Sequence, residues 1–185
     1  MLQAVTMTGK GTPICRVPWN EPGIIGRMLD AGARGIIIPM VNSVEEAERA
    51  VAATKYPPLG QRSYGPTIIG GRAENAGEDY SPTANQTNAC IPMIETRDAV
   101  ENLDAILAVE GVDAIYVGPA DLSLSYGYGP AYSDDNDEYK EVLEHIVERC
   151  NKAGKIAGIH STSALAANRR EKGFMMQTIS GDIAA

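Results

Sequence analysis

The chain has 185 residues, the size of a single domain, and its 44% hydrophobic and 22% charged residues are a mixture that can bury a globular core. Its 24 acidic residues outnumber the 16 basic ones and leave a net charge of −8, so we expect neither nucleic acid nor an anionic membrane as a partner, because both favour basic surfaces. The sequence has no apolar run of about 18 residues, no signal-peptide pattern at its start and 3 scattered cysteines without disulfide or metal-finger spacing, so we expect a cytoplasmic protein.

Six short apolar runs predict β-strands. They are continuous rather than alternating, which is typical of strands buried on both faces. In chain order they cover Pro13–Cys15, Gly35–Pro39, Cys90–Ile94, Ala114–Val117, Ile156–Ile159 and Phe174–Ile179.

Amphipathic patterns between these runs predict helices. Ser43 and Glu46 have the spacing of a capping box and open a helix that runs to about Thr54. Other apolar stripes predict helices at Ile24–Leu29, Val100–Leu107 and Tyr139–Cys150, and a short, weak one around Leu165. Four glycines lie where a helix gives way to the next strand, at Gly32, Gly111, Gly154 and Gly173.

The alternation of strands and helices predicts an α/β fold with a parallel sheet and right-handed crossovers. An open sheet of this kind normally carries a glycine-rich phosphate loop after its first strand, and this chain has none. Polar residues follow several strands instead, as in a (β/α)8 TIM barrel, at Arg16, Glu95, Asp121 and His160. A full barrel needs eight units and about 250 residues. We therefore predict that residues 1–185 form one partial barrel domain with about six strands.

Two longer segments interrupt the alternation. Pro57–Asn88 is rich in Gly, Pro, Asn and Thr and is expected to form a loop with a short helix. Ser123–Asp137 is rich in Tyr, Gly and Asp. Long excursions of an α/β protein usually lie on its functional face, so we expect both near the site.

Two carboxylates follow neighbouring predicted strands. Glu95 ends one strand, and Asp121 follows the next in the segment Gly118–Asp121. On adjacent barrel strands they could face each other, and two carboxylates with water in the other positions suit Mg²⁺ or Mn²⁺. The alternative is that each caps the helix after its strand, because acidic residues are favoured at helix N-termini.

Two further polar residues at strand ends could each have one of two roles. Arg16 could hold a carboxylate or a developing enolate oxygen, or it could be a surface arginine in an ion pair. His160 could act as a general acid or base, although a structural, hydrogen-bonded histidine is the more common case. No lysine follows a predicted strand, so we do not expect a Schiff-base aldolase.

Several stretches of the chain resemble the HpcH/HpaI aldolase family. They are Arg16–Asn20 (RVPWN), Leu29–Met40 (LDAGARGIIIPM), Tyr56–Arg62 (YPPLGQR), Ile94–Arg97 (IETR) and Val117–Ser123 (VGPADLS). They occur in order over essentially the whole chain, which is far more specific than any single motif. The family comprises class II, metal-dependent pyruvate aldolases of the 4-hydroxy-2-oxoheptanedioate and 2-keto-3-deoxy-rhamnonate type, and it includes oxaloacetate decarboxylases.

The resemblance implies a barrel of the phosphoenolpyruvate/pyruvate type and a lyase that cleaves a 4-hydroxy-2-oxo acid to pyruvate and an aldehyde through a pyruvate enolate. Glu95 and Asp121 would bind a divalent cation, either Mg²⁺, Mn²⁺ or Co²⁺. Arg16 would be the catalytic residue that holds the 2-oxo group and stabilises the enolate. The substrate carboxylate would contact the backbone of Gly118, Pro119 and Ala120. The family also implies a homo-oligomer that acts on a small 2-oxo acid.

The chain departs from the family pattern at three points. Met93 stands where the family usually has a Gln, two residues before the metal-binding Glu. The Asp-x-Glu-His segment that supplies an acid/base histidine is absent, and the last helix is cut short at Ala185. We therefore expect barrel units three to eight only, and decarboxylation, which needs no hydroxyl base, should survive better than aldol cleavage.

Two other functions compete with the aldolase. The chain could be a truncated, non-catalytic remnant or an assembly partner, since an open barrel leaves two strand edges unpaired. It could also be a CoA-ester lyase of the wider superfamily, which shares the carboxylate pair. The segments Arg16–Asn20 and Tyr56–Arg62 argue against a CoA-ester lyase.

Overall fold

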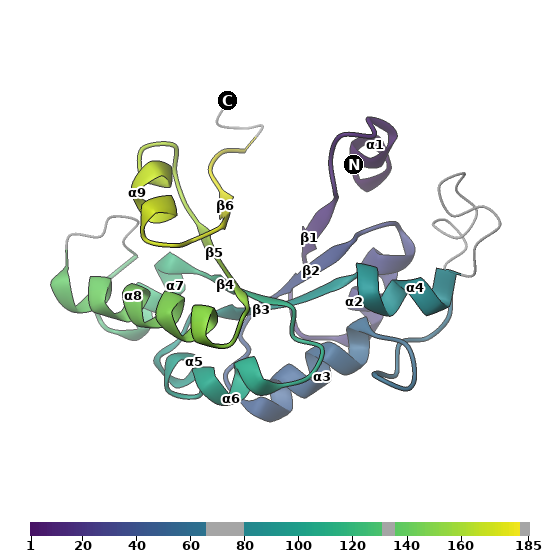
Figure 1. Cartoon of the computed structure of the whole chain (residues 1–185), viewed down its shortest axis with the longest axis horizontal. Coiled ribbons are helices and arrows are strands. Elements are labelled where there is room, and N and C mark those ends of the chain that lie inside the picture. The colour runs from purple at the N-terminus through teal and green to yellow at the C-terminus, as the bar shows by residue number, and fades with distance from the viewer. Residues whose placement is uncertain (66–79, 131–135, 182–185) are drawn as a thin grey trace.

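The curled sheet is the central feature of the chain, which a computed structural model describes for residues 1–65, 80–130 and 136–181 (Figure 1). Within these residues, 6 parallel strands form one sheet in the order of the sequence. The strands are β1 (Ile14–Arg16), β2 (Gly35–Ile38), β3 (Ala89–Ile94), β4 (Ala114–Val117), β5 (Ile156–His160) and β6 (Met176–Thr178). In Figure 1, β1 and β6 rise on opposite sides of an opening in the curl. The predicted incomplete α/β barrel is confirmed.

The helices follow the strands and lie mainly on the outer side of the curl (Figure 1). Their bounds are α1 (Leu2–Met7), α2 (Pro22–Asp30), α3 (Val44–Thr54), α4 (Tyr80–Thr87), α5 (Arg97–Glu101), α6 (Leu103–Ala108), α7 (Pro119–Ser125), α8 (Asp137–Lys152) and α9 (Ala166–Glu171). The predicted C-cap glycines all have positive φ, between 67° and 110°, at Gly32, Gly111, Gly154 and Gly173. Glycine adopts that conformation without steric cost, which explains why these helices end there.

Several predicted boundaries are corrected by the structure. The stripe Val100–Leu107 is broken at Asn102 into α5 and α6. Residues 123–125, expected to begin a loop, belong to α7, a helix that the apolar pattern did not predict. The short helix expected in the first long segment is α4. Residues 66–79 of the first segment, residues 131–135 of the second and the end of the chain at 182–185 lie outside the described residues.

The predicted capping box at the start of α3 forms only in part. The Ser43 hydroxyl accepts a hydrogen bond from the Glu46 backbone N–H at 3.3 Å, as predicted. The Glu46 carboxylate does not reach back to Ser43 but accepts from the backbone N–H of Asn42 at 2.7 Å. These two hydrogen bonds therefore stabilise the β2–α3 turn as well as the first turn of α3.

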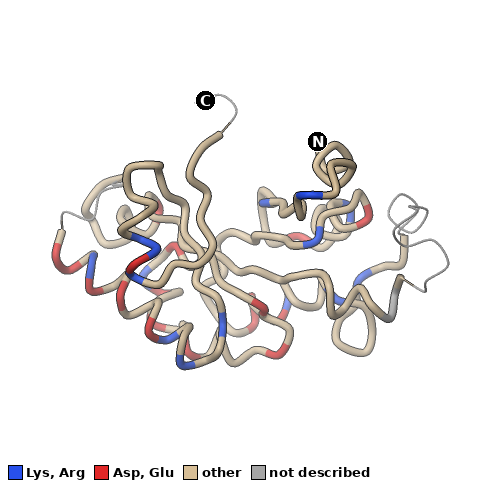
Figure 2. Tube along the Cα trace, turned by 45° about the horizontal axis from the view of Figure 1, so that its top comes forward, with Lys and Arg blue, Asp and Glu red and all other residues tan. Residues whose placement is uncertain are grey.

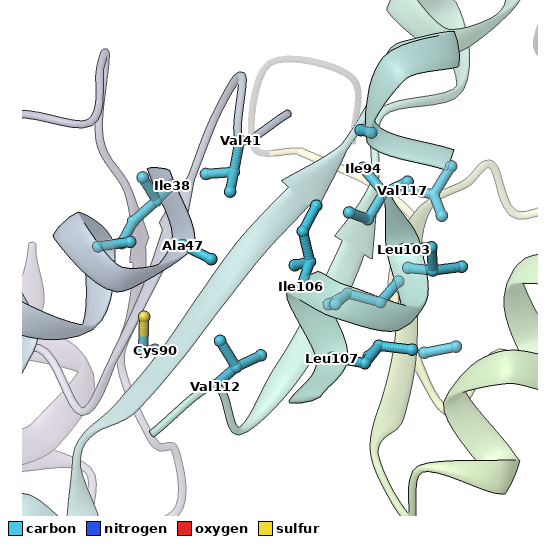
Figure 3. Packing of buried hydrophobic residues seen from close by; sticks show 14 of the residues in the cluster. Ile38, Val41, Ala47, Cys90, Ile94, Leu103, Ile106, Leu107, Val112 and Val117 are labelled. Carbon is cyan, nitrogen blue, oxygen red and sulfur yellow. The ribbon is translucent and has the colours of Figure 1, made fainter. Parts of the chain in front are cut away.

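The main core lies between the outer face of the sheet and the helices (Figure 3). Ile38, Cys90, Ile94 and Val117 point outward from their strands, and each of them is fully buried. They pack in one cluster with Ala47 of α3 and with Leu103, Ile106 and Leu107 of α6. Burying a side chain of this size stabilises the fold by about 1.5–3 kcal/mol. The inner face of the sheet is buried as well, which explains why the strands are continuous apolar runs in the sequence.

A second, smaller cluster lines the inner face of the sheet. It contains Ile91 and Met93 of β3 and Ala114 and Tyr116 of β4. Parallel neighbours pair Met93 with Tyr116 and Ile94 with Val117. Because side chains alternate between the two faces of a strand, the residues in phase with Met93 and Tyr116 face inward as well. One step beyond the last pair, that phase reaches Glu95 and Gly118.

The outer helices carry a mixed charged surface. In Figure 2, acidic and basic residues interleave along α8, whose 16 residues bury Tyr139, Leu143, Ile146, Val147 and Cys150 on one side. Among the described residues, no helix combines the length and the apolar character that a bilayer crossing requires.

Candidate functional site

The candidate site is a cavity of about 360 Å³ at the carboxyl ends of the strands. Inward-facing residues of the strands and the first turn of α7 line it: Arg16, Ile37, Met93, Tyr116, Gly118, Pro119, Ala120, Asp121, His160 and Thr178. In parallel α/β barrels, strand-end residues converge at this edge. The structure therefore brings together most of the residues that the sequence singled out, with Glu95 directly beside them.

Glu95 is the buried carboxylate of this site. The residue is only 1% exposed, and its Oε1 accepts a hydrogen bond from the backbone N–H of Met40 at 2.7 Å. The other oxygen, Oε2, is buried and has no hydrogen-bond partner. Burial raises the pKa of Glu95 above its usual value, the Met40 N–H opposes that shift, Asp121 adds to it and Arg16 opposes it. Asp121 and Arg16 are thus close enough to act electrostatically on Glu95.

Asp121 and the Gly118–Ala120 segment follow β4, the strand beside the one that precedes Glu95. Gly118 is the N-cap of α7, and Asp121 is an exposed acidic residue of its first turn. The N-cap of α5 is Thr96, whose hydroxyl accepts from the Ala99 N–H. Neither carboxylate is therefore an N-cap, although Asp121 does lie in a helical first turn, where the helix dipole favours negative charge.

The remaining walls are contributed by more distant strands. Arg16, at the end of β1, is exposed. Tyr116 donates a hydrogen bond to the Thr178 hydroxyl at 2.7 Å, which joins β4 to β6 across the cavity. His160 ends β5, and its backbone carbonyl accepts a hydrogen bond from the fully buried Arg169 of α9. Cationic, hydroxyl and imidazole groups therefore surround the carboxylates.

The residues present fit a divalent cation. An ionised carboxylate oxygen that is buried without a partner is costly, so an unpaired Glu95 Oε2 implies a missing positive ligand or a retained proton. Carboxylate oxygens are hard donors, which suits Mg²⁺ or Mn²⁺. Over the described ranges, no group of three or more His, Cys, Asp or Glu side chains is arranged to bind a metal. Glu95 and Asp121 would thus be the only side-chain ligands from this part of the chain.

Gly118 is required by the space beside Glu95. A Cβ atom at this position would lie 2.5 Å from Glu95 Oε2 and 3.0 Å from Met93 Cε. We expect Gly118→Ala to displace the Glu95 carboxylate, because that side chain can move and the backbone cannot. The expected result is a loss of Mn²⁺ affinity of about 10-fold or more, with a small effect on thermal stability, measured by calorimetric titration and thermal unfolding.

Gly26→Ala is the matched control for this prediction. A Cβ at Gly26 meets nothing within 4 Å on α2. It should therefore leave Mn²⁺ binding unchanged and stabilise the helix by about 0.5–1 kcal/mol. A Gly118→Ala variant that binds Mn²⁺ as well as the parent protein would contradict the assignment of Gly118.

A larger cavity of about 840 Å³ lies elsewhere, between α2, α3 and the segment 61–63. Arg62 on its wall is held by Asp30 at 2.6 Å and lies 4.5 Å from the centre of the Tyr56 ring. The cavity contains none of the strand-end residues, so size alone does not identify the site.

Sequence reasoning missed three groups at the site. Tyr116 and Thr178 had a usable signal, since Tyr116 lies two residues before Gly118 on the same face and Thr178 ends the last strand. The Met40 N–H had no such signal, because a backbone group leaves no pattern in the sequence and Met40 is 55 residues away from Glu95.

Comparison with known proteins identifies clear relatives. Residues 1–181 match the family described as HpcH/HpaI aldolase/citrate lyase. The chain is 39% identical over 185 residues to a hydroxypyruvate/pyruvate aldolase of Rhizorhabdus wittichii, covering 100% of this chain and 72% of that protein. It is 38% identical over 171 residues to a 4-hydroxy-2-oxo-heptane-1,7-dioate aldolase of Salmonella paratyphi B, covering 92% of this chain and 64% of that protein.

A solved structure is similar as well. A HpcH/HpaI aldolase/citrate lyase family protein from Burkholderia cenocepacia superposes with a TM-score of 0.87 at 31% identity, covering 98% of this chain and 72% of that one. The chain therefore shares the fold of this solved structure. It spans between 64% and 72% of the length of the three relatives.

Proposed function

The chain belongs to the HpcH/HpaI aldolase/citrate lyase family, and from that premise we propose that it acts as a metal-dependent lyase on a small 2-oxo acid. The substrate is a 4-hydroxy-2-oxo acid, which is cleaved to pyruvate and an aldehyde, and oxaloacetate is a second substrate. The relatives with 39% and 38% identity are named as aldolases, which supports this class of reaction.

One observation carries the proposal. Glu95 is a buried carboxylate with one unpaired oxygen, and it lies beside a cavity that also contains Asp121 and Arg16. A buried anion without a partner is unfavourable unless a cation or a proton completes it. A structural role would leave Glu95 hydrogen-bonded through both oxygens, so the arrangement favours a ligand-binding one.

The chain's own residues then have distinct tasks. Glu95 and Asp121 would hold the divalent cation, either Mg²⁺, Mn²⁺ or Co²⁺, which supplies a Lewis acid for the carboxylate and keto oxygens of a 2-oxo acid. Arg16 would donate hydrogen bonds to the 2-oxo group and stabilise the negative charge that develops on it. Gly118, Pro119 and Ala120 would present their backbone to the substrate carboxylate.

The two reactions share one enolate. In aldol cleavage, a base takes the C4 hydroxyl proton, the C3–C4 bond breaks and its electron pair passes into the pyruvate enolate. In decarboxylation, the same electron pair is left when CO₂ departs from oxaloacetate, and no hydroxyl base is needed. Protonation of C3 then gives pyruvate in both cases. We therefore expect decarboxylation to be less sensitive than aldol cleavage to the loss of a hydroxyl base.

The test is pyruvate release from oxaloacetate and from a 4-hydroxy-2-oxo acid by protein shown to be folded. Mg²⁺, Mn²⁺ and Co²⁺ are each added to metal-free protein, and EDTA is the control. Turnover that depends on metal and disappears with EDTA supports the proposal. A folded protein that binds metal and releases no pyruvate would instead support a non-catalytic remnant, and turnover of acyl-CoA esters alone would support a CoA-ester lyase.

A homo-oligomer in the cytoplasm completes the proposal. The family resemblance, which implies a homo-oligomer, supports this part of the proposal. Size-exclusion chromatography with light scattering would measure the oligomeric state.

A further inference from the structure

The turn after β2 has an unusual backbone. Met40 has φ of 54°, and it is the only residue other than glycine with a positive φ within the described ranges. That left-handed region is disfavoured for residues with a Cβ, and such residues occur mainly where the surrounding structure holds them for a purpose. Met40 is followed by Val41, which is fully buried in the main core.

The strained residue faces Glu95. Its backbone N–H donates to Glu95 Oε1 at 2.7 Å, a short bond of the kind made to a charged acceptor. The bond fixes one oxygen of the carboxylate, and Oε2 remains without a protein partner beside Gly118. The two oxygens of Glu95 thus differ in their hydrogen bonding: Oε1 accepts from the Met40 N–H, and Oε2 accepts from no protein group.

Asn42 connects this turn to the loop that carries Glu95. Its side-chain oxygen accepts from the Thr96 hydroxyl, and its side-chain nitrogen donates to the Met40 carbonyl at 3.4 Å. Its backbone N–H and carbonyl are also used, by Glu46 at 2.7 Å and by the Asn102 side chain at 2.9 Å. All four polar groups of Asn42 are therefore used. The bond from Thr96 ties the β2–α3 turn to the β3–α5 turn, and the bond from Asn102 ties it to the junction of α5 and α6.

We propose that the Met40–Asn42 turn is a positioning device for Glu95: it holds Oε1 through a strained backbone amide and presents Oε2 to the metal. Met40 and Asn42 act through Glu95 and are positioning residues. This inference rests on the proposed function for the identity of the metal site. The contact itself is a property of the metal-free protein, so the two can be tested separately.

The first test uses metal-free protein labelled with ¹⁵N-methionine. The chain has only 7 methionines, and the Met40 signal is assigned as the one that Met40→Leu removes. An amide that donates to a carboxylate resonates downfield, and we expect Glu95→Gln to shift it upfield and to speed its exchange with solvent. A Met40 signal that does not respond to Glu95→Gln overturns the proposal, whatever the protein binds.

The second test measures Mn²⁺ affinity by calorimetric titration in three Met40 variants. Glycine adopts this backbone without cost, so Met40→Gly should bind Mn²⁺ within about 2-fold of the parent protein. Met40→Leu is the control for the side chain and should do the same. Met40→Val places a β-branched residue where it is least tolerated and should lose affinity by about 10-fold to 100-fold. Equal binding by a folded Met40→Val variant overturns the proposal.

Asn42→Ala decides the matter if Met40→Val does not fold. It leaves the Met40 residue intact and removes the side-chain bonds to Thr96 and to the Met40 carbonyl, and we expect weaker Mn²⁺ binding together with a shifted Met40 amide signal. Unchanged binding and an unchanged signal would overturn the role of Asn42. If the parent protein binds no Mn²⁺ while its Met40 signal still responds to Glu95→Gln, the metal site of the proposed function is wrong and the positioning of Glu95 stands.

Discussion

Glu95→Gln is expected to make the metal-free protein more stable while it destroys the proposed metal site. Gln keeps an acceptor for the Met40 N–H and replaces a buried charge by a neutral amide, which costs less to bury. We expect a gain of about 1 kcal/mol, which is about 2–4 °C in the unfolding midpoint of a chain this size. Mn²⁺ affinity should fall by more than about 100-fold, because one of the two proposed side-chain ligands is lost.

The stability gain depends on pH in a defined way. The pKa of Glu95 is raised in the folded protein, so the folded state favours the protonated form. The penalty for its charge is absent below the unfolded pKa and appears as the pH rises through the raised folded value. In thermal melts with EDTA, Glu95→Gln should therefore unfold at a higher temperature than the parent protein at neutral pH. This difference should disappear near pH 4, where about half of an ordinary glutamate is protonated.

Asp121→Asn is the matched control for Glu95→Gln. Asp121 is exposed, so removing its charge should weaken Mn²⁺ binding and leave the unfolding midpoint of the metal-free protein nearly unchanged. If Glu95→Gln lowers the unfolding midpoint at neutral pH, the buried charge of Glu95 does not destabilise the metal-free protein, which would contradict this prediction.

Arg16→Ala is expected to abolish both reactions of the proposed lyase. A donor that stabilises a developing oxyanion contributes about 10²-fold to 10³-fold to kcat. Arg16 is the only arginine or lysine among the described residues that line the cavity. Arg16 is exposed, so its replacement should change the free energy of unfolding by about 0.5 kcal/mol or less. Pyruvate release from oxaloacetate, followed with saturating Mn²⁺, measures the effect.

Two variants make this result specific. Arg16→Lys keeps the charge but loses the planar pair of donors, so it should recover only part of the activity. Arg27→Ala removes an exposed arginine of α2 that lines the other cavity and should have no effect. Decarboxylation that is unchanged in Arg16→Ala would contradict the role given to Arg16 and, with it, the proposed enolate chemistry.

The fold was largely readable because its signals are local. Continuous apolar runs separated by amphipathic helices predict buried parallel strands, and β4 was predicted at its observed bounds. The helix break at Asn102 was missed because the apolar stripe continues across it in α5 and α6. The short helix α7 was missed because its segment is rich in residues typical of turns.

The sequence by itself determined which chemical groups line the candidate site and at which edge of the sheet they gather. Strand-end positions in a parallel sheet share one edge, so the places of Arg16, Glu95 and Asp121 along the chain were enough to predict that they lie together. Only the tertiary structure decided their states: that Glu95 is buried, that its Oε2 lacks a partner and that Gly118 must remain small beside it. The hydrogen bond from the Met40 amide to Glu95 likewise became visible only in the tertiary structure. These are contacts between residues far apart in the chain, and burial and backbone strain depend on packing that no local pattern encodes.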